Sequence, residues 1–260
     1  MAQLLGNVPQ AQRDDRWLAL HAGRLAATEH HADAVSAFIA SSLGPDPAYL
    51  GRNLRYLRTR ALAGIRAYAR AQQEWEQLSA AHPYSPLTAA DSALAIAIET
   101  RLAEGVSLAN LRWHRRQALD AQQADRPGLA IEHHREWLLL ARSCKPRPPA
   151  DAFADVELAL GADLLTLDAP AAAIAHLARV PPGHQQRRGA LFQALSSYRL
   201  DRPDSARERA RWAALSTDAA VRERANQLLR SLDPIPPAPD QDESATAPHA
   251  PAPVPVPDRR

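Results

Sequence analysis

The feature that most constrains this 260-residue sequence is a regular alternation of amphipathic stretches and proline-containing turns. Within each stretch, apolar and alanine positions recur three and four residues apart, which is the period of an α-helix that buries one face. Alternating apolar and polar runs, which are typical of strands, are nearly absent. The pattern therefore predicts an all-α fold, with helices in residues 17–27, 54–63, 87–102, 108–119, 129–140, 153–167, 191–200 and 221–232.

The turns between these stretches are short and resemble one another. Three of them place an aspartate two residues before a proline, in residues 125–128, 168–170 and 201–204. Proline at a first helical turn is a start signal, because its missing N–H would be unpaired there anyway. Connections this short require successive helices to lie antiparallel, so the sequence predicts a series of helix hairpins.

The spacing of small and large residues resembles the tetratricopeptide (TPR) repeat family. A TPR unit of about 34 residues has a small residue in its second helix, a large one four residues later and a proline about eight residues beyond that. Ala71, Trp75 and Pro83 match this pattern. The small-then-large step recurs more weakly elsewhere, as Ala34 with Phe38, Ala130 with His134 and Ala173 with Leu177, and Ala206 follows a TPR-like turn.

The repeat is irregular. Successive alanines of this set are 37, 59, 43 and 33 residues apart, and only the last interval is close to the family value. The interval of 59 predicts an extra helix between Leu87 and Leu119. The resemblance implies a TPR-like right-handed array of antiparallel helix hairpins over residues 14–232, after a flexible N-terminus in residues 1–13.

The last 28 residues, 233–260, differ in composition from the rest. Nine of them are proline, and alanine, aspartate, serine and threonine make up much of the remainder. Such a segment buries too little apolar surface to offset its ordering entropy. We expect a disordered Pro/Ala-rich tail with polyproline II character.

A second resemblance is narrower. The segment 75–78 (WEQL), followed by 82–87 (HPYSPL), is similar to helix-plus-proline phrases of TPR-like envelope proteins, including the superhelical domain of soluble lytic transglycosylases. This likeness implies a peptidoglycan-associated accessory protein. The catalytic domain of those enzymes is not expected here, because no stretch after residue 232 could fold into it.

Catalytic and cofactor-binding motifs are missing from the sequence. There is no G-x-S-x-G, no phosphate loop of the G-x-x-x-x-G-K-[ST] type and no G-x-G-x-x-G. The single cysteine, Cys144, has no identified base, and the adjacent pairs His30-His31 and His133-His134 point about 100° apart on a helix, so neither pair can share a metal ion. The sequence predicts a protein that is not an enzyme, without catalytic, metal or cofactor sites.

A basic segment is the most prominent candidate for a binding surface. Residues 47–73 contain no acidic residue, while arginine is frequent and tyrosine is interleaved. A stripe of arginines beside tyrosines can grip phosphates or carboxylates by forked hydrogen bonds and stacking. The opposing interpretation is that these arginines pair with acids on neighbouring helices. The candidates are Arg52, Arg55, Tyr56, Arg58, Arg66 and Arg70.

Trp113 is the other candidate. The five tryptophans lie at helical positions with apolar neighbours, where packing between helices is the expected role. Trp113 differs, because Arg112, His114, Arg115 and Arg116 flank it, so on a concave surface it could anchor a partner.

Together these features favour a non-catalytic scaffold that binds a peptide or a partner helix on a concave helical surface. Two alternatives remain: an envelope accessory protein, and anion or nucleic-acid binding through the arginine-rich helix. The net charge of only +2 makes nucleic acid an unexpected partner. No export signal or membrane span is evident, so we expect a cytoplasmic protein, or a periplasmic one if a signal has been removed.

Overall fold

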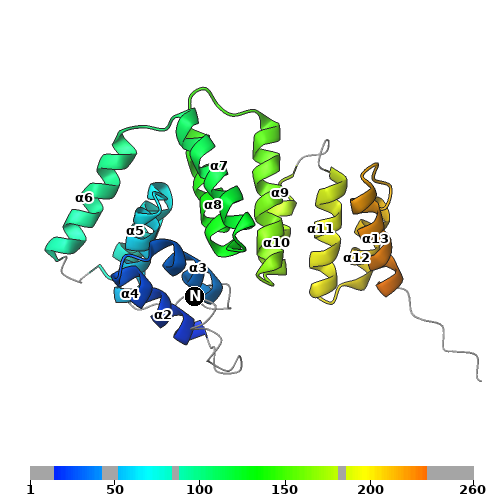
Figure 1. The fold of residues 1–260 in the computed structure, drawn as a ribbon, viewed down its shortest axis with the longest axis horizontal. Helices are drawn as coiled ribbons and strands as arrows, with labels where there is room; N and C mark the ends of the chain where they lie inside the picture. Colours follow the sequence, from blue (N-terminus) through cyan, green and yellow to red (C-terminus); the bar gives the residue numbers. More distant parts are fainter. Residues whose placement is uncertain (1–14, 43–51, 84–87, 181–185, 233–260) are drawn as a thin grey trace, which may run out of the picture.

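A computed structural model of the chain describes residues 15–42, 52–83, 88–180 and 186–232. These residues form twelve α-helices, without a strand among them, which follow one another along an elongated array (Figure 1). The fold is all-α, as predicted. The helices are α2 (Asp15–Ala27), α3 (His31–Ser42), α4 (Arg52–Gly64), α5 (Tyr68–Ala81), α6 (Ala89–Ala103), α7 (Leu108–Gln123), α8 (Pro127–Ser143), α9 (Ala150–Thr166), α10 (Pro170–Leu177), α11 (Gln186–Arg199), α12 (Pro203–Ala213) and α13 (Ala219–Leu232).

Ten of the helices form five hairpins, which are α2/α3, α4/α5, α7/α8, α9/α10 and α11/α12. Each hairpin turn has one residue in the left-handed region, with φ between 53° and 64°, and the same pair of backbone hydrogen bonds back to the first helix. Many helices end in this way, with a left-handed residue just after their last turn. The five left-handed residues are Glu29, Arg66, Asp125, Asp168 and Asp201.

The sequence repeat corresponds to this structural repeat. Five residues after each left-handed residue comes one of the predicted small positions, and all five are fully buried in the second helix of their hairpin. A small side chain at such a point lets the two helices pack closely. The small residues are Ala34, Ala71, Ala130, Ala173 and Ala206.

Helix α6 interrupts the array. It lies within the interval of 59 residues, where the sequence predicts an extra helix, and a capping box of Thr88 and Asp91 fixes its start. It packs on α5 and, less extensively, on α4, whereas α8 packs on α3 and α5 (Figure 1). The third hairpin therefore joins the first two directly, and α6 stands beside the array.

Alanine-rich packing accounts for the core. One cluster joins α2–α8 around Phe38, Leu62 and Ile98, and a second joins the third and fourth hairpins around Trp137 and Leu164. Helix α8 belongs to both clusters, and twelve of its seventeen residues are buried. It is the helix on which the two halves of the array meet.

Several predictions fall outside the described part of the chain. The flexible N-terminus at 1–13 and the Pro/Ala-rich tail at 233–260 lie there, as does the side chain of Trp17. Among the described helices, none is both long and apolar enough to cross a membrane.

Candidate functional site

A pocket of about 510 Å³ lies where α6 leaves the array. Its walls come from the turn before α5, the end of α6, and helices α7 and α8. The apolar lining includes Leu102, Val106 and Leu140. The polar and aromatic lining includes Arg66, Tyr68, Asn110, Trp113, His114 and Glu136. Pockets of this size with an apolar wall and a few convergent polar groups are typical of binding sites.

Two of the residues singled out in the sequence, Arg66 and Trp113, meet at this pocket. The guanidinium carbon of Arg66 lies 5.4 Å from the centroid of the Trp113 ring, within the range of a cation–π contact. Arg66 is exposed, Trp113 is half-buried, and no described carboxylate forms an ion pair with Arg66. The structure thus brings together a basic side chain and an aromatic one that are far apart in the sequence.

A buried histidine pair stands behind Trp113. Nδ1 of His114 lies 3.1 Å from Nδ1 of His133, so one ring donates the hydrogen bond and the other accepts it. Burial lowers the pKa of His114 to about 3 and that of His133 to about 4. Both rings are therefore neutral near pH 7, and the His114 ring packs edge-on against Trp113.

Glu136 forms the inner end of the pocket. Its two carboxylate oxygens accept hydrogen bonds from the backbone N–H groups of Ala69 and Arg70, at 2.9 and 2.8 Å, and so cap the start of α5. Burial raises the pKa of Glu136 to about 7, although both hydrogen bonds lower it. This carboxyl group therefore links the pocket to the packing of α8 on α5, and it titrates near neutral pH.

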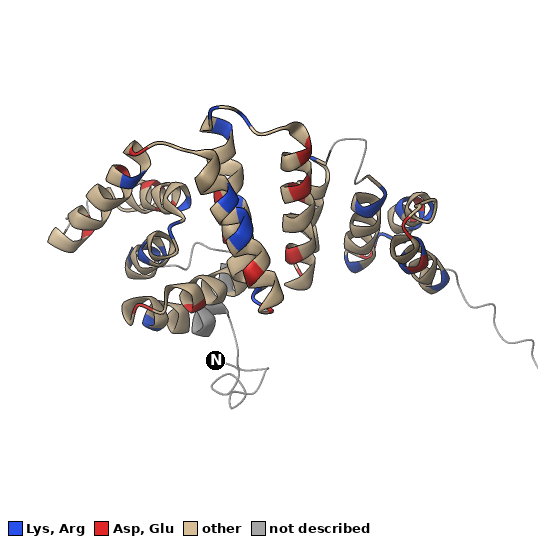
Figure 2. Cartoon of the chain, turned by 45° about the horizontal axis from the view of Figure 1, so that its top comes forward, with Lys and Arg blue, Asp and Glu red and all other residues tan. Residues whose placement is uncertain are grey.

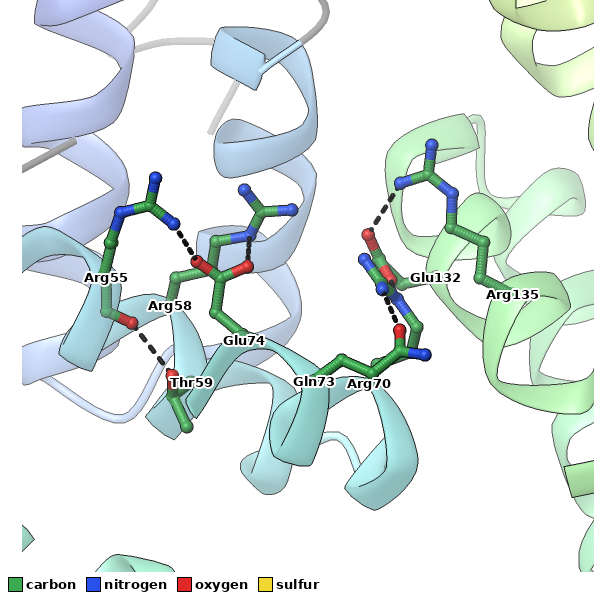
Figure 3. Close-up of polar contacts among 8 residues, drawn as sticks. All are labelled: Arg55, Arg58, Thr59, Arg70, Gln73, Glu74, Glu132 and Arg135. Atoms are coloured by element: carbon green, nitrogen blue, oxygen red, sulfur yellow. Dashed lines mark hydrogen bonds and ion pairs between the residues drawn. The ribbon is translucent and has the colours of Figure 1, made fainter. Parts of the chain in front are cut away.

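The arginine stripe of the second hairpin is largely occupied by carboxylates within the fold (Figure 3). Arg55 donates to Glu74 at 3.3 Å, and Nε of Arg58 lies 3.5 Å from the same carboxylate. Arg52 donates to Asp91 of α6 at 2.7 Å. The interpretation that these arginines pair with neighbouring helices holds for all three, and Tyr56, half-buried on α4, lies outside the pocket lining.

Arg70 is likewise occupied. It donates to the buried Glu132 through Nε at 2.8 Å and to Gln73 through Nη1 at 2.7 Å, while Arg135 donates to the other oxygen of Glu132 at 3.0 Å (Figure 3). Burial alone would raise the pKa of the Glu132 carboxyl, but the two arginines outweigh it and hold that pKa well below its usual range. Figure 2 shows basic residues on the third hairpin and acidic residues on the neighbouring α9. Between these hairpins, Arg115 of α7 and Asp155 of α9 form an ion pair at 2.9 Å.

Tyr68, His114 and Glu136 also line the pocket, although the sequence did not single them out as site residues. A signal was present, because Glu132 and Glu136 stand four residues apart in the most buried helix, and an acidic pair there needs partners. Two further residues considered in the sequence, His134 and Cys144, are buried outside the pocket. His134 packs with its Nε2 3.4 Å from Asp163, and Cys144 is buried at the end of α8.

Comparison of the chain with known protein families, with curated proteins and with solved structures finds no match.

Proposed function

We propose that this chain is a non-catalytic interaction scaffold, TPR-like in its hairpins, which binds a peptide segment of a partner protein in the pocket between α5, α6, α7 and α8. The observation that carries the proposal is the meeting of Arg66 and Trp113 at that pocket. Aromatic and arginine side chains are the residue types that most often dominate the affinity of protein interfaces.

The chemistry of the pocket favours binding over proton transfer. Glu136 uses both oxygens to cap α5, and His114 uses Nδ1 to contact His133. Each titratable group at the inner end is therefore engaged in holding the fold. The exposed guanidinium of Arg66 and the half-buried ring of Trp113 remain for a ligand.

Anion binding through the arginine stripe has less support. Arg52, Arg55, Arg58 and Arg70 are each within 3.5 Å of a carboxylate of a neighbouring helix. A phosphate or nucleic-acid ligand would have to displace these contacts.

The proposal is tested by selecting binders from a random dodecapeptide library displayed on phage, with the full chain as the target. Affinities of selected peptides are then measured for the native chain and for the Trp113→Ala variant. We expect Trp113→Ala to weaken binding about tenfold or more, as for a central interface anchor. Arg112→Ala is the matched control, because Arg112 is the exposed neighbour on α7 and lies outside the pocket.

Two results would contradict the proposal. One is a library that yields no binder of the native chain. The other is a set of binders whose affinity is the same for the native chain and Trp113→Ala, while circular dichroism shows that the variant is folded.

A further inference from the structure

The five hairpin turns permit a comparison within the chain itself. The left-handed position is acidic in four hairpins, where it is Glu29, Asp125, Asp168 or Asp201. It is basic only in the second hairpin, where it is Arg66. That is also the hairpin whose turn lines the pocket.

The backbone of the turn gives no reason for an arginine. The two turn hydrogen bonds of Arg66 match those of the other hairpins: its N–H donates to Ala63 and the next N–H donates to Leu62. Among residues with a side chain, aspartate and asparagine adopt the left-handed region most readily. Arg66 therefore occupies a backbone position that aspartate would fill with less strain.

The left-handed turn residues also differ in the contact that they make with the next hairpin. Glu29 pairs with Arg60 of the following hairpin at 3.4 Å, and Asp168 pairs with Arg199 of the following hairpin at 3.3 Å. The equivalent side chain of the second hairpin, Arg66, instead lies over the Trp113 ring of the following hairpin. An ion pair that joins hairpins elsewhere is here replaced by a cation on an aromatic face.

Among the described residues that line the pocket, Arg66 is the arginine that forms no ion pair with a described carboxylate. The other arginine of the lining, Arg101, pairs with Glu104 at 2.8 Å. Glu136 already accepts two backbone hydrogen bonds. A guanidinium in cation–π contact with a ring still has N–H groups free for a carboxylate, which it can hold with two parallel hydrogen bonds.

We infer that the pocket selects a peptide by an acidic side chain, whose carboxylate is held by Arg66 while its carbon atoms lie against Trp113 and Leu102. This inference rests on the proposed function and names the chemistry of its ligand. A volume of about 510 Å³ exceeds one aspartate or glutamate side chain, so residues beside the acid also enter the pocket.

The test compares the same dodecapeptide selection on the native chain and on Arg66→Asp. This variant is suited to the purpose, because it installs the residue type that three other hairpins carry at this position and should fold. Peptides are fused to the phage coat at their C-terminus, so any carboxylate that is selected belongs to a side chain. The control target is Arg112→Asp, which makes the same change of charge at an exposed residue of α7 outside the pocket.

We expect peptides selected on the native chain and on Arg112→Asp to be enriched in aspartate or glutamate at one position, and those selected on Arg66→Asp to lack this enrichment. Replacing that acid by its amide should weaken binding to the native chain about tenfold or more, and it should not weaken binding to Arg66→Asp, where the substituted carboxylate repels the acid. Binders that depend on Trp113 but show no acidic enrichment would overturn the inference and leave the proposed function standing. A selection without binders would overturn both.

Discussion

Replacement of Glu136 by glutamine tests how a buried acid links the pocket to the fold. Glu136 is almost fully buried on α8, and its carboxylate accepts the N–H groups of Ala69 and Arg70 at the start of α5. A glutamine at this position keeps the shape of the side chain and one acceptor oxygen, but it cannot ionise. The two proteins should therefore differ in how their stability depends on pH.

The magnitude follows from the pKa of Glu136, which burial raises from 4.5 to about 7. Because the folded state holds this proton more tightly than the unfolded chain, the contribution to stability is complete below about pH 4.5. It is lost as the pH rises through about 7. Between pH 5 and pH 8 the loss amounts to about 2.5 kcal/mol, at about 1.4 kcal/mol for each unit of pKa.

The assay is urea unfolding followed by circular dichroism at pH 5, 6, 7 and 8. The native chain should lose about 2.5 kcal/mol of unfolding free energy across this range relative to Glu136→Gln. Glu99→Gln, on the exposed face of α6, serves as the control and should follow the native curve. If the native and Glu136→Gln curves run parallel, the carboxyl group titrates as in water and the reasoning about its burial is wrong.

Three further changes test the packing of α8. Glu132→Gln should lower the unfolding free energy by about 3 kcal/mol or more, since it leaves the buried guanidinium of Arg70 without its carboxylate; an unchanged urea midpoint would contradict this. Gly128→Ala should cost about 1–3 kcal/mol in the same assay, because its Cβ would lie 3.0 Å from the backbone of Ser36 on α3, and a variant as stable as the native chain would show that α3 can move away. Trp137→Ala should lower the unfolding free energy by about 3–5 kcal/mol, because it removes a buried ring from the second core cluster. A melting temperature within a degree or two of that of the native chain would contradict this prediction.

Much of the fold could be predicted from the sequence. Helix periodicity and short turns indicated the hairpins, and the small residues at Ala34, Ala71, Ala130, Ala173 and Ala206 proved to be fully buried in equivalent places. These signals are local, because one helix turn or one hairpin suffices to express them. The extra helix within the long interval could be predicted for the same reason, because its own apolar pattern and the length of the interval were sufficient.

The ion pairs could not be predicted in this way. Arg58 and Glu74 belong to antiparallel helices of one hairpin, and their meeting depends on the rotation of α4 against α5. Arg70 and Glu132 are 62 residues apart and meet only because α8 packs on α5. The basic stripe was visible in the sequence, but the acids that occupy it were distributed over three other helices.

The position of the pocket follows from the break in the repeat. In an uninterrupted array, the helix after α5 would begin the next hairpin and pack on it. Here α8 packs on both α3 and α5, so α6 has no place between the second and third hairpins and lies beside them. Its end then forms one wall of a space whose other walls are the turn at Arg66 and the third hairpin. The turn at this break carries Arg66 over Trp113, whereas the other four hairpin turns carry an acidic residue at the equivalent position. The arginine thus stands at the one hairpin turn of the described array that lines this pocket.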